Sequence, residues 1–516
     1  MTDLRDLPKL LRDDPAVLRV LGRSNAVLSV PEHGRSYVVA GLVAATTRRP
    51  YLVAVPTTAE AERLYRDLRT WLGDAAVELF PAWETLPFER VSPNVETMGR
   101  RLRTIWRLRH DPPDVVVAPV RALVQRLGPH VEDFDPVRVA PGEQRDRDEL
   151  VAALVGAGYR REDQVEHRGE VAVRGSIVDV FPVTADRPVR IDLWGDEVDR
   201  LTEFSVTDQR STVELDEACI FPARELLATD EVRQRAASLV ATEPWGREQW
   251  ERLADGLVFD GMESWLPWLA PDERLLPDLL PADAQVVLVE PRRLRDRGAD
   301  VAAEELDLAR TLATTWGAAD RQFPSMHLGF ERLLAGTEAP AWTLTSVPES
   351  PEVVTIAATP WEAPTGDGER LVAQLQHLLR TGVRVVVAAD TEGSAGRVRQ
   401  LLRDRGVDVD VAVGALDRGA VFPAAGVAVL AEPDVTGRRR THRAPRVRRR
   451  DAERFFDDLK VGDFVVHHQH GVARYGGMVK RAIGGTERDY LLLEYRGNDK
   501  LYVPSDQIDA VRHYTG

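Results

Sequence analysis

The chain has 516 residues, a formal net charge of −15, 43% hydrophobic residues and one cysteine. These values exclude a disordered, collagen-like or disulfide-stapled chain, and the length predicts three or four compact domains. Because the sequence has no run of about 18 apolar residues and no apolar segment behind its N-terminus, we expect no membrane contact, no secretory signal and a cytoplasmic location.

The first segment, 1–133, is predicted to fold as an α/β domain. Its apolar runs 51–56 and 114–119 are short, continuous and rich in valine, which is typical of buried parallel strands. After the first run, Thr57 is a candidate N-cap for an amphipathic helix over 59–72. Strands that alternate with helices of this length indicate βαβ units.

Residues 29–36 occupy the place of a phosphate-binding P-loop, between an apolar strand and an apolar helix. A working P-loop needs glycines for its tight path and a lysine that reaches the outer phosphates. Here Ser29 replaces the first glycine, Pro31 removes a backbone donor and Arg35 replaces the lysine. The sequence therefore predicts a degenerate P-loop, of which Gly34, Arg35 and Ser36 remain.

The second half of an ATPase site is an apolar strand that ends in paired acids, which hold magnesium. The best match, 286–290, ends in the single acid Glu290 and is followed by a proline. The histidines within 467–470 are better explained by a turn than by a metal, because no cysteine or acid accompanies them. We therefore expect no catalytic residue, no bound cofactor and no metal ion in this chain.

Residues 134–223 are predicted to form a mainly β insertion. Period-2 alternation along the strands 170–174 and 189–194 assigns five side chains to the outer face of a sheet. They are Ala172, Arg174, Arg190, Asp192 and Trp194. An exposed tryptophan among arginines is typical of a protein-binding hot spot. The alternative is that Trp194 packs under a neighbouring loop.

The next two segments are predicted to differ in class. Residues 224–346 are expected to be helical and rich in tryptophan, with one strand at 285–290. A third α/β unit is expected over 347–437, with a helix at 392–405. Its predicted strands are 353–358, 384–390, 408–414 and 426–432.

An arginine-rich segment, 438–458, is predicted to be a linker that could also contact nucleic-acid phosphates. After it, 459–516 holds five short apolar runs separated by turn signals, which indicates a small SH3-like or Tudor-like barrel. The predicted strands are 463–467, 472–483, 489–495, 500–504 and 507–511. The segment 479–483 could pair with a partner strand at a barrel edge, although an ordinary hairpin is the default explanation.

Several motifs occur in the order found in bacterial transcription-repair coupling factors. They are FPAWETLPF at 80–88, RGSIVDVFP at 174–182, RIDLWGDE at 190–197, HGVARY at 470–475 and DKLYVP at 499–504. Over essentially all of its residues, the chain resembles the N-terminal half of this family.

The resemblance implies a set of domains and partners. A module similar to the excision-repair protein UvrB would bind UvrA through Arg174, Arg190 and Trp194. An RNA-polymerase-interacting domain similar to CarD would bind the polymerase β subunit through Val479, Lys480, Arg481 and Ile483. The implied divisions are 1–133 (UvrB-like domain 1a), 134–223 (UvrA-binding), 224–346 (UvrB-like domain 1b), 347–437 (third domain), 438–458 (linker) and 459–516 (polymerase-interacting).

The resemblance also implies that the family's motor, a double-stranded DNA translocase using ATP and magnesium, follows the terminal barrel and is missing here. We therefore predict an α/β multi-domain adaptor that links stalled transcription to nucleotide excision repair. Two alternatives remain: a UvrB-related repair helicase subunit, disfavoured by the absent P-loop lysine, and a CarD-like transcription regulator. Of these, only the CarD-like regulator is expected not to bind UvrA.

Overall fold

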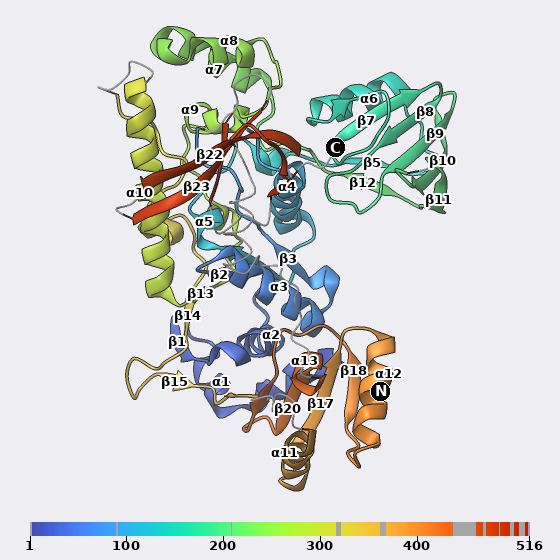
Figure 1. Ribbon diagram of the computed structural model, residues 1–516, viewed down its shortest axis with the longest axis vertical. Coiled ribbons are helices and arrows are strands. Elements are labelled where there is room, and N and C mark those ends of the chain that lie inside the picture. The colour runs from blue at the N-terminus through green and yellow to red at the C-terminus, as the bar shows by residue number, and fades with distance from the viewer. Residues whose placement is uncertain are drawn as a thin grey trace.

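The computed structural model describes residues 3–88, 91–207, 209–315, 321–361, 368–436, 461–467, 471–483, 486–495, 500–504 and 511–513. In these ranges the chain forms four sheets of five or more strands and one two-stranded sheet, with helices packed around them (Figure 1). None of the helices in this part of the chain is long and apolar enough to span a membrane.

A seven-stranded sheet has only parallel pairings, in the order β15-β1-β14-β13-β2-β4-β3. This sheet and the helices packed on its two faces are called the first body. Its strands are β1 (Ala26–Ser29), β2 (Tyr51–Val55), β3 (Val77–Leu79), β4 (Val115–Pro119), β13 (Gln285–Val289), β14 (Ala341–Thr345) and β15 (Val354–Thr355). Strands β2 and β4 are buried along their whole length, as predicted for 51–56 and 114–119.

Helices cover both faces of this sheet, which is why its strands are apolar throughout. One face packs against α2 (Arg35–Ala45) and α3 (Thr58–Leu72), together with the N-terminal helices η1 (Leu4–Asp13) and α1 (Pro15–Val20). The other packs against α4 (Val95–His110), α5 (Val120–Leu123) and the start of α10 (Pro291–Thr315). The hydroxyl of Thr57 accepts a hydrogen bond from the Glu60 amide, which confirms the predicted N-cap.

The insertion forms a six-stranded sheet in the order β11-β10-β9-β8-β7-β6, set to one side of the first body in Figure 1. Its strands are β6 (Arg160–Arg161), β7 (Glu170–Arg174), β8 (Ile177–Val180), β9 (Val189–Trp194), β10 (Glu197–Phe204) and β11 (Ser211–Glu214). Helix α6 (Arg147–Gly156) packs on the inner face, and β5 (Val137–Val139) pairs with β12 (Ala218–Ile220). The two strands predicted from alternation are confirmed.

Two buried ion pairs hold the point where the chain leaves the insertion. Glu225, fully buried, binds the guanidinium of Arg101 and accepts a hydrogen bond of 2.9 Å from the Trp83 indole. Next to it, Arg224 donates to Glu263 at 2.7 Å. Trp83 belongs to the motif FPAWETLPF. Its hydrogen bond to Glu225 therefore fixes the segment in which the chain passes from the insertion back to the first body.

The Trp-rich segment folds as α7 (Asp230–Thr242), α8 (Arg247–Ala254) and α9 (Leu266–Leu269) around a core of Trp250, Trp265 and Trp268. The prediction of a single strand in 224–346 is wrong, because β14 is a second one. Its alternating Trp342 and Leu344 are buried against the helices of the first body, and both neighbouring strands pair with it in parallel.

The third unit has a five-stranded sheet in the order β16-β19-β20-β17-β18. Its elements are β16 (Thr359–Pro360), α11 (Gly368–Arg380), β17 (Arg384–Ala389), α12 (Glu392–Arg403), β18 (Asp410–Val413), β19 (Ala420–Phe422), β20 (Val427–Ala431) and α13 (Glu432–Thr436). The strand predicted at 353–358 does not belong to this sheet. It shortens to β15, which pairs with β1, because Val354 and Ile356 pack into the core of the first body.

The terminal segment forms a five-stranded antiparallel sheet in the order β24-β23-β22-β21-β25. Its strands are β21 (Phe464–His467), β22 (Gly471–Ile483), β23 (Thr486–Glu494), β24 (Lys500–Pro504) and β25 (Val511–His513). Of the fifth predicted strand, 507–511, only Val511 is described, and it begins β25; 507–510 lie outside the described residues. The predicted linker 438–458 lies outside the described residues.

Candidate functional site

Strand register on the six-stranded sheet brings the predicted outer-face residues together in two rows. In one row Arg190 of β9 lies opposite Asp179 of β8, which in turn lies opposite Ala172 of β7. In the other, Asp192 lies opposite Ile177, which lies opposite Arg174. The alternation predicted for β9 is confirmed, because its residues 189, 191 and 193 are buried while those between them are not.

Asp179 holds both arginines of this face. Its carboxylate is only 1% exposed and accepts hydrogen bonds from Arg190 Nε at 2.8 Å, Arg190 Nη2 at 2.9 Å and Arg174 Nη2 at 2.7 Å. Such two-pronged binding fixes the plane of a guanidinium as well as its position. The hydrogen bonds that Arg190 donates to Asp179 also raise the pKa of Arg190.

Arg190 is covered on its remaining sides. Its guanidinium lies 4.7 Å from the ring centre of Phe204 and donates to the backbone oxygen of Gln209 at 3.1 Å, so its side chain is only 14% exposed. The Arg174 side chain is 45% exposed and reaches the Gln209 amide oxygen at 3.2 Å. Arg190 is thus largely enclosed within the outer face, whereas Arg174 is accessible to solvent.

Trp194 stands at the open end of β9 and is 83% exposed. The next residue, Gly195, has φ +62 and turns the chain into β10, with Glu197 pairing back to Trp194. A large indole left this far in water is unusual, because burying it would be favourable. The alternative in which Trp194 packs under a loop is therefore wrong.

The prediction that Ala172 lies outside needs correction. It is 1% exposed and packs with Val165, Phe181 and Phe204 in a small cluster of its own. The chain around Val165 and Phe204 folds over that half of the outer face, which alternation along a single strand cannot reveal. The open half is the one with Arg174 and Trp194.

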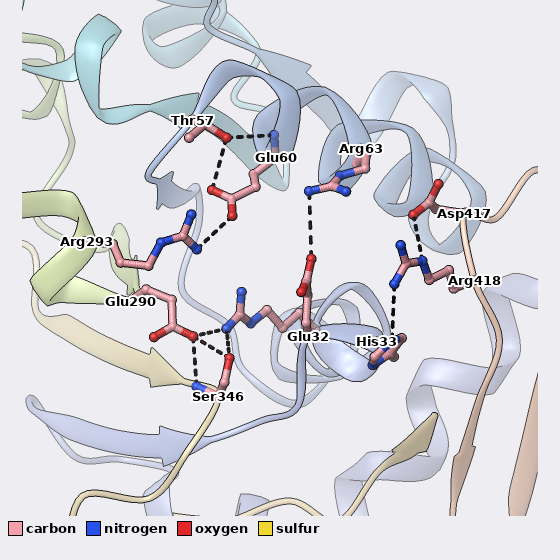
Figure 2. A network of polar contacts seen from close by, with 11 residues as sticks. Glu32, His33, Thr57, Glu60, Arg63, Glu290, Arg293, Ser346, Asp417 and Arg418 are labelled. Atoms are coloured by element: carbon pink, nitrogen blue, oxygen red, sulfur yellow. Dashed lines mark hydrogen bonds and ion pairs between the residues drawn. The ribbon is translucent and has the colours of Figure 1, made fainter. Parts of the chain in front are cut away.

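The segment predicted as a degenerate P-loop lies between β1 and α2, beside a small cavity (Figure 2). Arg35 forms a buried ion pair with Glu290, the acid at the end of β13. It also donates to the Ser346 hydroxyl at 2.5 Å, and both the hydroxyl and the amide of Ser346 donate to Glu290. Arg35 and Glu290, which the sequence predicts in the places of a P-loop lysine and a magnesium-binding acid, therefore neutralise each other.

Other charges lining the cavity are paired in the same way. Glu60 accepts a hydrogen bond of 2.8 Å from Arg293, and Arg63 lies 3.7 Å from Glu32 (Figure 2). A ligand phosphate entering this cavity would have to separate existing ion pairs.

Asp67 lies in the same cavity and accepts a hydrogen bond of 3.0 Å from the Asp417 amide. Burial raises the pKa of Asp67 from 3.8 to about 7; the Asp417 charge adds to this rise, and the hydrogen bond from the Asp417 amide opposes it. Because the folded form holds this proton more tightly than the unfolded form, the stability contributed by Asp67 is complete below pH 4 and is lost as the pH rises to 7.

We expect Asp67→Asn to remove this pH dependence, because the amide oxygen can still accept from Asp417 but cannot ionise. Relative to the parent, the variant should melt about 2–4 °C higher at pH 8 and nearly unchanged at pH 4. Calorimetry at both pH values measures the difference. Equal shifts at pH 4 and pH 8 would contradict a titrating Asp67.

The predicted polymerase-binding segment lies on β22. Residues 471–474 of this strand pair with β21, whereas 479–483 pair with β23 and with no other described strand. Val479 is half-buried opposite Tyr490; the side chains of Lys480, Arg481 and Ile483 lie outside the described part. Within the described residues, 479–483 of β22 therefore form an ordinary hairpin with β23, and pairing of their other side with a partner strand stays a prediction.

The histidine motif is only partly described. His467 is buried on β21, and 468–470 lie outside the described residues. One trio of potential metal ligands is present in the described part, His130, Glu132 and Asp133. Both of its acids are already paired with arginines, Glu132 with Arg274 and Asp133 with Arg109.

Family models match two parts of the chain. The UvrB interaction domain matches 137–226, and the CarD-like/TRCF RID domain matches 459–515. Over all of its length, the chain is 35% identical to the transcription-repair-coupling factor of Mycobacterium bovis. It is 31% identical to that of Myxococcus xanthus and 27% identical to that of Bacillus subtilis, each over 93% of this chain.

Along its whole length the chain is homologous to transcription-repair-coupling factors. It spans slightly less than half of these relatives, 46%, 45% and 44% of their respective lengths. Within this coupling-factor homologue, the UvrB interaction domain contains the sheet with Asp179 and Trp194, and the RID domain contains the sheet with β22. The cavity at Arg35 lies outside both matched domains.

Sequence reasoning missed Asp179 as a site residue. The signal was present, because 177–180 reads Ile-Val-Asp-Val, with an acid inside an apolar strand, where a charge needs a partner. Its two partners are more than four residues away in sequence, and only the register between strands identifies them.

Proposed function

We propose that the chain is the adaptor region of a transcription-repair-coupling factor. It recruits UvrA through the open half of the outer face and binds the RNA polymerase β subunit through the terminal domain. In the intact protein, an ATP-dependent motor acting on double-stranded DNA would displace the stalled polymerase in the cytoplasm. The whole-length homology, with matches at both proposed docking domains, supports this proposal.

The exposed Trp194 is the single structural observation that most favours UvrA recruitment. Trp194 and the half-exposed Arg174 lie on the same face of the sheet, so they offer a partner apolar area and charge that cost little to immobilise. Arg190 contributes by holding the same face in place. A pull-down with purified UvrA tests the proposal, since a CarD-like regulator with unrelated upstream domains would not bind.

For RNA polymerase, we propose addition of a partner strand along 479–483. Backbone groups on the free side of a strand bind another strand without demanding a particular side chain. Val479, Lys480, Arg481 and Ile483 would then select the partner. We further propose that the five terminal strands form a CarD-like, SH3-like barrel and that the domain limits are those predicted from the sequence.

We also propose that the seven-stranded sheet is a degenerate UvrB-like nucleotide fold without cofactor or catalytic activity. The pairing of Arg35 with Glu290 supports this view, because the two groups that would serve phosphate and magnesium bind each other. A UvrB-related helicase subunit would need both groups free.

ATP titration of the purified chain should show no saturable binding in the micromolar range, with or without magnesium. Arg35→Lys is expected not to restore binding, because the lysine would still face Glu290, and Ser29 and Pro31 would still shape the loop. Fluorescent ATP analogues and calorimetry give independent readouts. Saturable micromolar binding by the parent chain would refute a degenerate pocket.

A further inference from the structure

The third α/β unit shares an apolar core with the first body. The Phe422 ring lies 4.2 Å from the ring of Tyr37 on α2, and Leu416 and Val429 belong to the same buried cluster as α2 and α3. Figure 1 shows this unit lying against α2. Contacts of this kind join two units that would otherwise bury separate cores.

The loop between β18 and β19 lies at the mouth of the Arg35 cavity. Its Asp417 amide donates to Asp67, and its Ala415 oxygen accepts a hydrogen bond of 2.7 Å from the Thr70 hydroxyl. Arg418 reaches the His33 ring at 3.3 Å (Figure 2). Both Asp417 and Arg418 line the cavity together with residues of α2 and α3.

The two units approach each other closely at Gly34, immediately before α2. A Cβ at this glycine would lie 2.8 Å from Cβ of Ala358 and 3.1 Å from the Phe422 ring. Across the interface, a Cβ at Gly414 would lie 2.5 Å from Leu4 and 2.7 Å from Thr70. Separations below 3.0 Å leave no room for a side chain at either position.

We propose that the third α/β unit is a fixed cap on the former nucleotide pocket, which gives this unit a function. Phosphates bind at a helix N-terminus after a glycine-rich turn, where backbone donors and the helix dipole converge. Here 358, 415–418 and 422 cover that approach and join the two units into one body. The inference rests on the proposed degenerate nucleotide fold, because a working pocket has to open.

Hydrogen exchange of the full chain, followed by mass spectrometry, tests the cap. Gly34→Val adds a side chain where the two units approach closely and should speed exchange at least tenfold in 29–37 and also in 415–422 across the interface. Gly396→Val is the matched control, since Gly396 is exposed on α12 with nothing within 4 Å of an added Cβ. It should leave both segments at the parent rate.

Phe422→Ala removes contacts from the other side of the interface. It keeps the test decisive if Gly34→Val fails to fold. It should speed exchange in 29–37, although the substitution lies in the third unit. Parent-like exchange of 415–422 in Gly34→Val, or of 29–37 in Phe422→Ala, would overturn the cap. Binding of ATP by the parent chain would instead refute the degenerate pocket, so the two failures are distinguishable.

Discussion

Replacing Trp194 by alanine is expected to weaken binding of UvrA about thirtyfold or more, corresponding to about 2 kcal/mol. The indole is 83% exposed in the free chain, so its truncation removes contact area without opening a cavity in the fold. Calorimetric titration of UvrA with the parent and the variant measures the change. The melting temperature of the variant should match that of the parent within about 1 °C.

Val155→Ala provides the matched control for this titration. Val155 is an exposed apolar residue of α6, which packs on the opposite face of the same sheet. Its truncation should leave UvrA affinity unchanged. Equal affinities for the Trp194 and Val155 variants would mean that UvrA binds elsewhere or not at all.

Replacing Arg190 by alanine is expected to lower both UvrA affinity and the stability of the UvrB interaction domain. The substitution removes two of the three arginine hydrogen bonds to Asp179, whose carboxylate is almost completely buried. Because Asp179 would keep only the hydrogen bond from Arg174, the loss should approach the roughly 3 kcal/mol that an unpaired buried charge costs. Hydrogen exchange of β8 and β9 amides reports the stability of this domain within the full chain.

The double variant Asp179→Ala with Arg190→Ala separates the two effects. Without the carboxylate no buried charge is left short of hydrogen bonds, so much of the lost stability should return. UvrA affinity should stay low, because Arg174 loses its fixed position. Stability losses that simply add in the double variant would contradict coupling between Asp179 and Arg190.

Local patterns in the sequence were sufficient to predict those elements that are determined by residues close to them in the chain. Valine-rich β2, the Thr57 cap of α3 and the alternation of β9 all depend on interactions within a few residues. Strands β14 and β15 were missed or misplaced for the opposite reason. Each pairs with β1, more than 300 residues earlier, and that pairing decides their place.

The same distinction holds for the functional surface. Alternation placed Arg190 and Trp194 on one face, but it could not distinguish their environments. Trp194 is open because it stands at a strand end, whereas Arg190 is enclosed by Asp179, Phe204 and Gln209 from other segments. The salt bridge of Arg35 with Glu290 likewise joins residues 255 positions apart, and only the folded sheet brings them together.

Docking of two partners at once, without nucleotide, is tested most directly by a bridging experiment. A polymerase β-subunit fragment is immobilised, the chain is added, and UvrA is applied in the absence of ATP. We expect the parent chain to be retained and to capture UvrA, and the Trp194→Ala variant to be retained without capturing it. Failure of the parent chain to bind β, or equal capture of UvrA by both proteins, would contradict the adaptor function.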